Sequence, residues 1–341
     1  MGDILLEVKD LRIEFVVEKK RLTAVHDMNF SIQKGHTLAV VGESGCGKSV
    51  TATSIMRLLP KINSRITDGQ ILLEGRDIVA MSEREIRKIR GDRISMIFQD
   101  PMTALNPVYT IGKQMTEMYR VHNSISKKDA FEKCVDMLER VGIPLPRQRM
   151  NEYPHQLSGG MRQRIMIAMA LSCNPDLLIA DEPTTALDVT IQAQILEQMR
   201  RLQSELNTAI MLITHDMGVV AEMADEVMVM YAGEMVEYGT AGEVFDAPAH
   251  PYTRGLLKSI PRLDSDDREE LFTIEGVVPS LDEFGDGCRF ANRCPYVSEA
   301  CGADRVALTE MEGTHVARCC RLGELRLPKR QIDLTRGKTQ T

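Results

Sequence analysis

Residues 42–49, GESGCGKS, place three glycines before a lysine and a serine. Glycines let the backbone curl, so that successive N–H groups point inward at phosphate oxygens. The spacing fits the phosphate-binding loop G-x-x-x-x-G-K-[ST], in which Lys48 reaches the β- and γ-phosphates and the Ser49 hydroxyl ligates Mg²⁺. The predicted nucleotide-binding residues are Gly42, Glu43, Ser44, Gly45, Cys46, Gly47, Lys48, Ser49 and Val50.

The context of this loop favours a nucleotide site over a chance glycine-rich turn. The apolar run TLAVV (37–41) predicts a strand before the loop, and SVTATSIMRLL (49–59) predicts a helix after it, stopped by Pro60. The N-terminus of this helix adds partial positive charge for a phosphate. The same setting is expected to lower the pKa of the Cys46 thiol, so that alkylation would block nucleotide binding.

Two acids follow a second apolar run, in LLIADE (177–182). The run predicts a buried strand that delivers Asp181 and Glu182 at its carboxyl end, where open α/β sheets bind ligands. Asp181 suits the Mg²⁺ shell, and Glu182 suits a base that polarises the attacking water. Two ordinary acids at a strand end are the alternative.

The segment LSGGM (157–161) precedes the helical run MRQRIMIAMALS. Ser158 is expected to cap that helix, and the amides of the two glycines form a second anion site at its N-terminus. Two phosphate-binding surfaces predict a sandwich, in which a nucleotide lies between the 42–49 loop of one subunit and the LSGG segment of another. A merely well-capped helix is the alternative. The predicted residues are Leu157, Ser158, Gly159, Gly160 and Met161.

Five of the eight cysteines crowd into 33 residues near the end of the chain. In a cytosolic protein such a group indicates a metal or cluster site more than disulfides. Four thiolates can hold a [4Fe–4S] cluster or a tetrahedral Zn²⁺ ion, although the close C-x₂-C pairs of zinc modules are missing. The spacing C-x₅-C-x₆-C-x₁₇-C selects Cys288, Cys294, Cys301 and Cys319, with Cys320 as the alternative fourth ligand.

The composition of the 341 residues limits the class of protein. The net charge is −7 and the pI about 5.6, which argues against a nucleic-acid partner, because no excess of Lys and Arg is present to neutralise phosphates. No apolar run approaches the roughly 20 residues that cross a bilayer. The N-terminus, MGDILLEVKD, lacks the features of a signal peptide. A cytosolic chain is expected, which works at a membrane only by docking on other chains.

Alternating strand and helix patterns predict a mostly parallel α/β sheet. Strands are predicted over 5–15, 69–75 and 94–98, with helical spacing over 111–141, where Ser126 is an N-cap and Gly142 a stop. Further strands are predicted over 175–183, 209–216 and 226–239, and a helix over 189–206. After about residue 246, prolines, acidic runs and cysteines dominate, which indicates a domain boundary.

These motifs resemble those of the ATP-binding subunits of ABC transporters, over nearly the whole chain. GESGCGKS resembles the Walker A loop, LLIADE the Walker B strand, and LSGGM the LSGGQ signature with Met161 in place of glutamine. The resemblance implies a P-loop NTPase fold: a parallel-sheet core, an antiparallel β subdomain, an inserted helical subdomain and a C-terminal extension with the cysteines. The implied ranges are 1–98 and 159–245 for the core, 99–158 for the helical signature subdomain, 246–327 for the extension, and 328–341 for a disordered tail.

The resemblance also assigns roles to residues outside these motifs. Gln99, in IFQDP, is similar to the Q-loop glutamine, which contacts Mg²⁺ and the water and senses the transmembrane partner. Asp188, in TALD, is similar to the D-loop aspartate. His215, in LITHD, is similar to the switch histidine that holds the γ-phosphate, with a buried core histidine as the alternative. Phe15 matches the aromatic residue that stacks on adenine, and Phe30 is the alternative.

The implied assignments form two sets. The catalytic residues are Lys48, Gln99, Glu182 and His215, and the Mg²⁺ ligands are Ser49, Gln99 and Asp181.

A narrower resemblance is to the peptide/nickel importer branch. FQDPMTALNPVYTIG, YPHQLSGGMRQR and ADEPTTALDVTIQAQIL match that branch, as does HPYT (250–253) at the start of its C-terminal extension. The resemblance implies an ATPase that energises import of dipeptides or oligopeptides, at the cytoplasmic face of the inner membrane. Its partners would be a second, paralogous ATP-binding subunit, two transmembrane permease subunits and an extracytoplasmic substrate-binding protein. The cysteine spacing also resembles that of dipeptide-type ATPases with an iron–sulfur cluster, which favours [4Fe–4S] over Zn²⁺.

Other functions remain as alternatives. An importer of nickel or another small solute in the same branch fits the same motifs. A soluble ABC ATPase that acts on DNA or ribosomes is disfavoured, because the chain has one phosphate-binding loop and is acidic. A P-loop kinase or GTPase is disfavoured by LSGGM and by His215.

Overall fold

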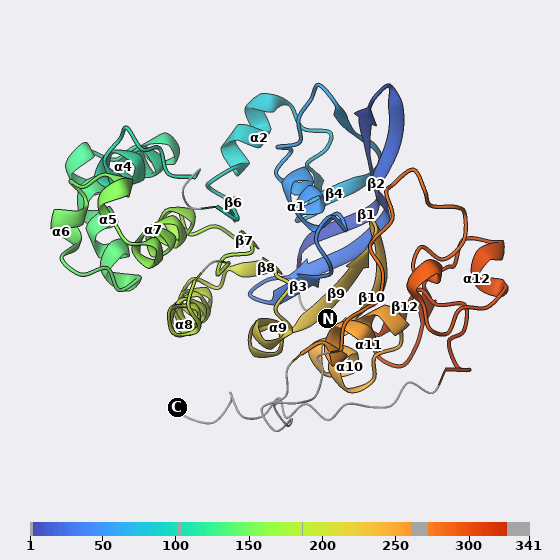
Figure 1. Cartoon of the computed structure of the whole chain (residues 1–341). Helices are drawn as coiled ribbons and strands as arrows, with labels where there is room; N and C mark the ends of the chain where they lie inside the picture. The colour runs from blue at the N-terminus through green and yellow to red at the C-terminus, as the bar shows by residue number, and fades with distance from the viewer. Residues whose placement is uncertain (1–2, 101–103, 186, 261–271, 326–341) are drawn as a thin grey trace. The chain divides into compact units, whose positions relative to one another are not determined.

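The structure, a computed structural model, describes residues 3–100, 104–185, 187–260 and 272–325 (Figure 1). The chain divides into two compact units. The first unit comprises Met1–Leu6, Ile32–His36 and Leu73–Ile213, and the second comprises Glu7–Ser31, Thr37–Leu72 and Thr214–Thr341. The domain boundaries inferred from the sequence stay predictions, and the predicted tail, 328–341, lies outside the described residues.

The first unit contains three parallel strands, β6 (Ile94–Ile97), β7 (Leu177–Asp181) and β8 (Ala209–Ile213). β7 lies between the other two, with Ile97 opposite Ala180 and Asp181 opposite Ile213. Every residue of β7 and β8 is buried, as expected for parallel strands covered on both faces. Asp181 therefore ends a buried strand, as the sequence predicts.

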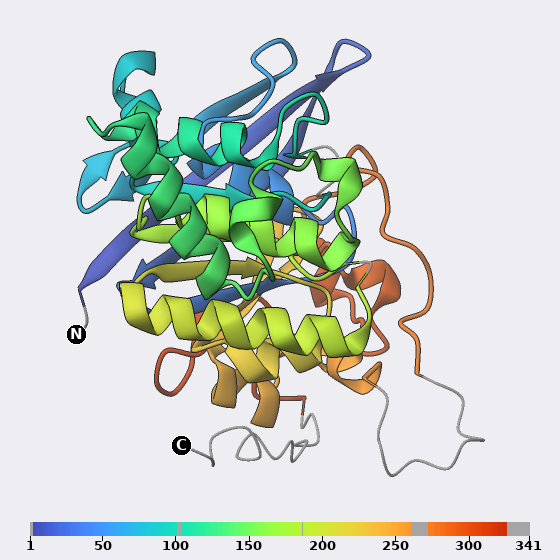
Figure 2. The same ribbon diagram turned by 90° about the vertical axis from the view of Figure 1, so that its left-hand side faces the viewer.

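The helices of the first unit lie around these strands. α4 packs against α5, α5 also contacts α6 and α7, and α7 contacts α8 and β6 (Figure 2). The side chain of Ser126 accepts a hydrogen bond from the backbone N–H of Asp129, which confirms the predicted N-cap. The helices of this unit are α2 (Glu83–Ile89), α4 (Ile111–His122), α5 (Lys127–Arg140), α6 (Pro146–Arg149), α7 (Gly159–Leu171) and α8 (Val189–Leu206), with the short strand β5 (Arg76–Asp77) and the turn η1 (Pro154–Gln156).

The second unit contains a β-hairpin and a mixed sheet. β1 (Ile4–Val17) and β2 (Lys20–Gln33) are joined by a two-residue turn with left-handed φ at Glu18 and Lys19, and β4 (Ser64–Leu73) lies beside β1. In the mixed sheet, β3 (Thr37–Val41) pairs in parallel with β9 (Glu226–Tyr231), which pairs antiparallel with β10 (Glu234–Thr240). Strands from the C-terminal region, β12 (Val316–Ala317) and β11 (Thr309–Glu310), continue this sheet beyond β10.

The helices of the second unit are α1 (Lys48–Ile55), α9 (Met217–Met223), α10 (Ala241–Asp246), α11 (Pro251–Lys258) and α12 (Ala300–Ala303), with the turn η2 (Ala291–Arg293). α1 ends before the predicted stop at Pro60. Arg57 adopts a left-handed conformation, and the N–H of Leu58 donates to the carbonyl of Thr53. This bond pattern is the Schellman type of helix end, which stops the helix by local geometry before the proline is reached.

An aromatic cluster joins the sheet of the second unit to the C-terminal extension. The rings of Tyr231, Tyr252 and Phe290 lie 4.8–5.3 Å apart between centroids, and Phe290 is 2% exposed. Tyr231 ends β9, Tyr252 lies in α11, and Phe290 lies among the cysteines. Because large aromatic side chains account for much of the burial energy of a core, this cluster holds the extension on the sheet.

We therefore expect Phe290→Ala to lower the free energy of unfolding by about 3–5 kcal/mol, the range for deletion of a buried phenylalanine. Phe272, which is 45% exposed, gives the matched control, and Phe272→Ala should change stability by less than about 1 kcal/mol. Urea unfolding of the purified chain, followed by circular dichroism, measures both. Equal effects of the two substitutions would show that the cluster does not hold the extension.

Candidate functional site

The 42–49 loop follows directly from the buried strand β3 in the second unit. A Cβ atom on Gly42 would lie 2.2 Å from the carbonyl oxygen of Met230 and 2.8 Å from Sγ of Cys46, at a φ of +151°. No side chain fits there. Gly47, with a φ of +101°, occupies the N-cap position of α1. The two glycines produce the curl that the motif predicts, and the loop ends at a helix N-terminus, a setting suited to anions.

Lys48 lies inside this curl. Its side chain is 6% exposed, and Nζ donates hydrogen bonds to the carbonyl oxygens of Gly42 at 2.7 Å and Glu43 at 2.9 Å. Ser44, Gly45 and Ser49 are exposed. The loop therefore offers a fixed cation within an open rim of backbone N–H groups and a hydroxyl, a combination that suits a triphosphate with its Mg²⁺.

The predicted activation of Cys46 is wrong. Cys46 is 1% exposed, and burial raises the pKa of its thiol, although the nearby Lys48 opposes the rise. The helix N-terminus does not compensate for the loss of water around the thiolate. The side chain packs in the gap behind Gly42, so we interpret Cys46 as part of the packing of the loop.

His215 lies near the same end of β3. The N–H of Thr214 donates to the carbonyl of Val40, and His215, the next residue, is exposed. Its exposure excludes the alternative of a buried core histidine. Phe30 is 7% exposed and belongs to the core, whereas Phe15 on β1 is partly exposed, as a stacking surface must be. The roles of His215 and Phe15 stay predictions.

The first unit brings Gln99 and Glu182 together. Nε2 of Gln99 and the hydroxyl of Thr185 each donate to Oε2 of Glu182, both at 2.9 Å. Glu182 has a φ of +48°, and its N–H donates to the carbonyl of Ile213. A left-handed φ is uncommon for a residue with a side chain and often marks a functional site. The structure thus fixes both the backbone and the carboxylate of Glu182 beside Asp181.

The signature segment also lies in the first unit. Ser158 is exposed and caps α7 by accepting a hydrogen bond from the N–H of Met161, which confirms the predicted cap. A Cβ on Gly159 would meet open space, so the helix N-terminus is accessible from outside. Gln163 of α7 donates to the carbonyl of Pro183, directly after Glu182, and Asp188 caps α8 through the N–H of Ile191.

Two residues that the sequence patterns did not identify contact the phosphate-binding loop. The Tyr252 hydroxyl accepts a hydrogen bond from the N–H of Glu43 at 2.8 Å, and Arg293 forms an ion pair with the Glu43 carboxylate. Tyr252 belongs to the HPYT segment, which the sequence marks only as the start of the extension. No local pattern points to Arg293, because 250 residues separate it from its partner.

The cysteines of the extension gather in the second unit. Sγ of Cys301 lies 3.3 Å from Sγ of Cys320, so Cys320 is a contact partner of Cys301. Burial, with a contribution from neighbouring thiols, raises the pKa of Cys288 to about 11. Burial opposes ionisation of Cys301, but hydrogen bonds with Ser298 and Cys320 and the charge of Arg321 lower its pKa. Within the described residues, no group of three or more His, Cys, Asp or Glu side chains is placed to hold a metal ion.

Comparison with known families identifies both parts of the chain. Residues 25–185 match the ABC transporter family. This range contains the 42–49 loop, the LSGGM segment, Asp181 and Glu182. Residues 236–301 match the oligopeptide/dipeptide transporter C-terminal region, which includes Tyr252 and Arg293.

Curated relatives are similar over almost their full length. The chain is 50% identical to a probable peptide ABC transporter ATP-binding protein, y4tR of Sinorhizobium fredii, over 95% of this chain and 97% of the relative. It is 52% identical to the oligopeptide transport ATP-binding protein AppD of Bacillus subtilis, over 92% and 96%. The dipeptide transport ATP-binding protein DppD of the same organism is also 52% identical, over 92% and 93%.

Solved structures match the fold. The ATP-binding cassette MJ0796, in a dimeric post-hydrolysis state bound to ADP and phosphate, matches with a TM-score of 0.63 and 25% identity, over 70% of this chain and 99% of that one. CbiO1 of Clostridium perfringens, part of the ABC transporter complex cbiONQ, matches with a TM-score of 0.61 and 27% identity, over 72% and 91%.

The fold and these matches define an ABC-type ATPase. The chain belongs to the family of ABC transporter ATP-binding proteins, and it has the additional C-terminal region of the oligopeptide/dipeptide members. Among the described residues, none of the helices combines the length and the apolar character needed to cross a bilayer.

The burial of Cys46 predicts a thiol that does not react in the folded chain. Because its raised pKa lowers the thiolate fraction near neutral pH, we expect wild type and Cys46→Ser to show the same number of thiols that iodoacetamide labels rapidly at pH 7.5. In urea, the wild type should show one more than Cys46→Ser. Loss of a rapidly labelled thiol in native Cys46→Ser would instead show that Cys46 is accessible and ionised.

Proposed function

We propose that the chain is the ATP-hydrolysing subunit that energises peptide import across the cytoplasmic membrane, as part of a multi-subunit ABC transporter. The observation that carries this proposal is the curled loop with Lys48 fixed inside it. The relatives at 50–52% identity support the substrate class, because their names give peptides, oligopeptides and dipeptides. They favour peptides over nickel, and a transporter over a soluble ABC ATPase.

Binding of the triphosphate would use the residues of the loop. The N–H groups of residues 44–49 bind the phosphate oxygens, and Lys48 exchanges its bonds to the Gly42 and Glu43 carbonyls for bonds to the phosphates. Ser49, exposed beside Lys48, and Asp181, together with Gln99, are oxygen donors of the kind that Mg²⁺ prefers. When bound, Mg²⁺ neutralises charge on the β- and γ-phosphates. Phe15 stacks on the adenine in this proposal.

Hydrolysis would depend on Glu182. Its carboxylate accepts a proton from the attacking water, and its hydrogen bonds from Gln99 and Thr185 fix the direction in which it points. A base that is already oriented loses little entropy when the water is aligned. His215 and Lys48 stabilise the charge on the γ-phosphate as the bond breaks. The left-handed backbone at Glu182 supports this role, because it turns the residue out of the strand.

A second ATP-binding subunit would complete the site. The exposed Ser158 and the open space at Gly159 leave the N-terminus of α7 accessible, as a surface for the nucleotide of a partner requires. MJ0796, the structural relative with ADP and phosphate, is dimeric. We propose that the partner here is a paralogous ATP-binding chain, and that Asp188, exposed before α8, lies at the contact between the two.

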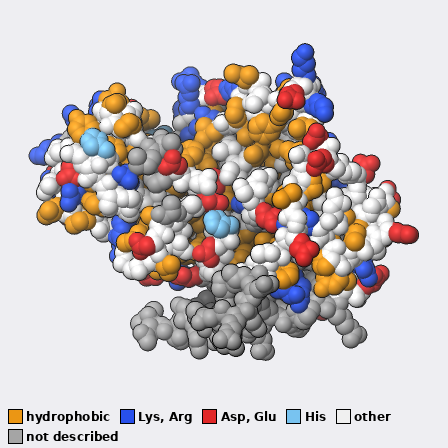
Figure 3. All heavy atoms as spheres, in the orientation of Figure 1, with side chains coloured by type: hydrophobic (Ala, Val, Ile, Leu, Met, Phe, Trp, Pro, Cys, Tyr) orange, Lys and Arg blue, Asp and Glu red, His pale blue; other side chains and the backbone are white. Residues whose placement is uncertain are grey.

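The permease subunits would dock on the helices of the first unit. A cavity of about 1090 Å³ is lined by residues of α4 and α5, including Lys113, Arg120, Lys127 and Phe131. Figure 3 shows apolar and basic side chains together on the surface of this helical region. The mixture suits a cytoplasmic permease segment with apolar and acidic side chains. An extracytoplasmic substrate-binding protein would deliver the peptide, and the chain itself would lie at the cytoplasmic face of the inner membrane.

A [4Fe–4S] cluster in the extension is a separate proposal, with Zn²⁺ as the alternative. Its support is the spacing of Cys288, Cys294, Cys301 and Cys319 in the sequence. The described geometry does not by itself close a four-thiol site, and Cys320 contacts Cys301 where Cys319 is predicted to be the ligand. A cluster would stabilise an extension that has little secondary structure, and we assign it no step in hydrolysis.

Replacement of Glu182 tests the proposed function. In the complete transporter, Glu182→Gln should bind ATP with near wild-type affinity but hydrolyse it about 10²–10⁴ times more slowly, the usual contribution of a general base. Lys48→Ala should lose ATP binding instead. Glu132→Gln, which removes an exposed carboxylate of α5, is the matched control and should turn over normally.

Proteoliposomes that contain the wild-type transporter should accumulate peptide. Those that contain Glu182→Gln or Lys48→Ala should not. Normal turnover by Glu182→Gln, in a complex whose other composite ATP site has been inactivated, would refute the catalytic assignment. Uptake of nickel in place of peptide would refute the substrate class.

Metal analysis of the anaerobically purified chain tests the cluster. We expect about four iron atoms and labile sulfide per chain, with visible absorption, as a [4Fe–4S] centre requires. Cys294→Ser should lose them, whereas Cys134→Ser, which changes a buried cysteine outside the extension, should retain them. One zinc per chain would support the alternative, and the absence of both metals would rule out a metal site in the extension.

A further inference from the structure

The phosphate-binding loop contains a carboxylate, Glu43, that the C-terminal extension neutralises. Nη1 and Nη2 of Arg293 lie 2.5 and 2.9 Å from the two carboxylate oxygens of Glu43. The side chain of Arg293 is 5% exposed, and that of Glu43 is 28% exposed. This paired geometry, with two parallel N–H···O bonds, is the strongest form of an Arg–carboxylate contact. Glu43 is thus partly exposed, whereas its counter-ion is buried.

The guanidinium is held in place by the extension itself. Nε donates to the carbonyl of Glu275 at 2.9 Å, and Nη2 donates to the carbonyl of Ile274 at 3.1 Å. The hydroxyl of Tyr231, in the aromatic cluster, lies 3.5 Å from Nη1. Four separate acceptors therefore fix Arg293, so it holds Glu43 as a rigid element of the extension.

The extension contacts the same residue a second time. The buried Tyr252 accepts the backbone N–H of Glu43, as described above, and Tyr252 is positioned by the start of α11. There, Nδ1 of His250 accepts the N–H of Tyr252 at 3.1 Å. The carboxylate of Glu237 accepts the N–H of Ala249 at 2.7 Å and of His250 at 2.8 Å. Both the backbone and the side chain of Glu43 thus depend on the extension.

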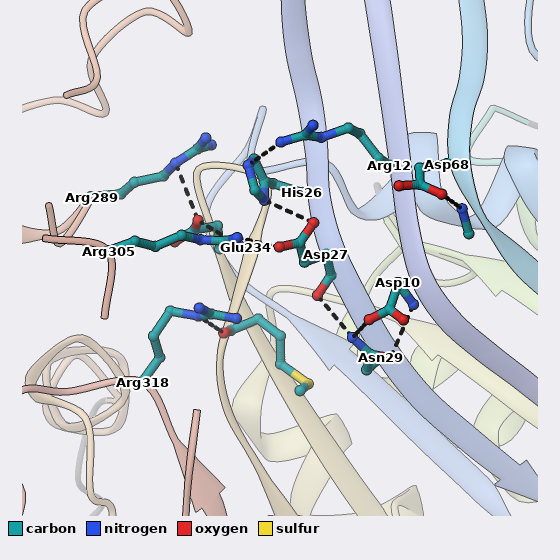
Figure 4. A network of polar contacts seen from close by, with 12 residues as sticks. Asp10, Arg12, His26, Asp27, Asn29, Asp68, Glu234, Arg289, Arg305 and Arg318 are labelled. Carbon is teal, nitrogen blue, oxygen red and sulfur yellow. Dashed lines mark hydrogen bonds and ion pairs between the residues drawn. The ribbon is translucent and has the colours of Figure 1, made fainter. Parts of the chain in front are cut away.

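A network of arginines attaches the extension to the sheet behind the loop (Figure 4). Arg305 pairs with Asp27 and Glu234, and Arg289 pairs with Glu234. Beside this network, the N–H of Gly233 donates to the carbonyl of Cys46 at 2.9 Å. The network holds the extension on β2 and on the β9–β10 turn, and the two ion-pair partners of Arg305, Asp27 and Glu234, lie outside the loop.

The position of Glu43 creates an electrostatic problem for the proposed ligand. A triphosphate bound by the loop brings several negative charges close to the carboxylate, and like charges at short range in a partly buried site repel strongly. A bidentate arginine offsets the carboxylate charge and holds the carboxylate in one orientation. Lys48 does not perform this task, because it contacts the carbonyl of Glu43 and not its carboxylate.

We propose that Arg293 is a positioning residue for nucleotide binding: it neutralises and orients Glu43, so that the affinity of the phosphate-binding loop depends on the C-terminal extension. The inference rests on the proposed role of residues 42–49 in ATP binding. It gives the extension a function in the ATPase cycle. Any change in the extension that displaces Arg293, which directly precedes Cys294, weakens nucleotide binding.

Three variants of the pair test this inference in the complete transporter. Arg293→Gln leaves Glu43 charged and unpaired, so the Kd and KM for ATP should rise about tenfold, with kcat changed less than threefold. Glu43→Gln removes the charge that needs neutralisation, and its own Kd is the reference with which the double variant is compared. The double variant, Glu43→Gln with Arg293→Gln, should recover most of the lost affinity. If Arg293 acts only by supporting the fold, removing the Glu43 charge as well should not restore the affinity for ATP.

Two controls separate the possible failures. Arg305→Gln breaks an ion pair of the same extension away from the loop, and its Kd should stay within threefold of wild type. If Arg305→Gln loses as much ATP affinity as Arg293→Gln, or if the double variant does not regain affinity, the effect is general destabilisation. Either result would overturn the role of Arg293. Wild-type affinity in Arg293→Gln, while Lys48→Ala loses binding, would overturn the inference alone. Unchanged binding in Lys48→Ala would instead overturn the proposed function.

Discussion

The close approach of two backbones, at Gly42 and Met230, is the constraint on which the functional site depends. β9 lies beside β3, and the carbonyl of Met230 occupies the space that a side chain at position 42 would need. The chain curls as it leaves β3. This curl places Nζ of Lys48 against the carbonyl oxygens of Gly42 and Glu43. A preorganised loop of this kind binds an anion without a large loss of backbone entropy. The cation and the N–H groups are in place before a ligand arrives.

The two compact units divide the chemistry between them. The second unit contains the phosphate-binding loop, His215 and the extension. The first contains the acids, Gln99 and the signature helix, linked by the contact between Gln163 and Pro183. Hydrogen bonds already orient Glu182 in its own unit. Each unit thus holds its own group of proposed site residues in a fixed local geometry.

The sequence predicts the elements whose signals are local. The strand at 37–41 and the helix at 189–206 match the structure residue for residue, because continuous apolar runs and a helical stripe are short-range patterns. The end of α1 was missed, because a left-handed arginine stops it without a glycine signal. The pKa of Cys46 was predicted in the wrong direction, since burial depends on a distant strand. The pair Glu43–Arg293 joins residues 250 positions apart, and no periodicity or motif encodes such a contact.

The most direct measurement is a structure of the assembled transporter with ATP and Mg²⁺ bound to the Glu182→Gln variant. The account predicts that the β- and γ-phosphates lie within hydrogen-bond distance of the N–H groups of residues 44–49. It also predicts that Nζ of Lys48 has left the carbonyls of Gly42 and Glu43 to contact these phosphates. A triphosphate bound elsewhere, with Lys48 still on its own loop, would contradict the central claim.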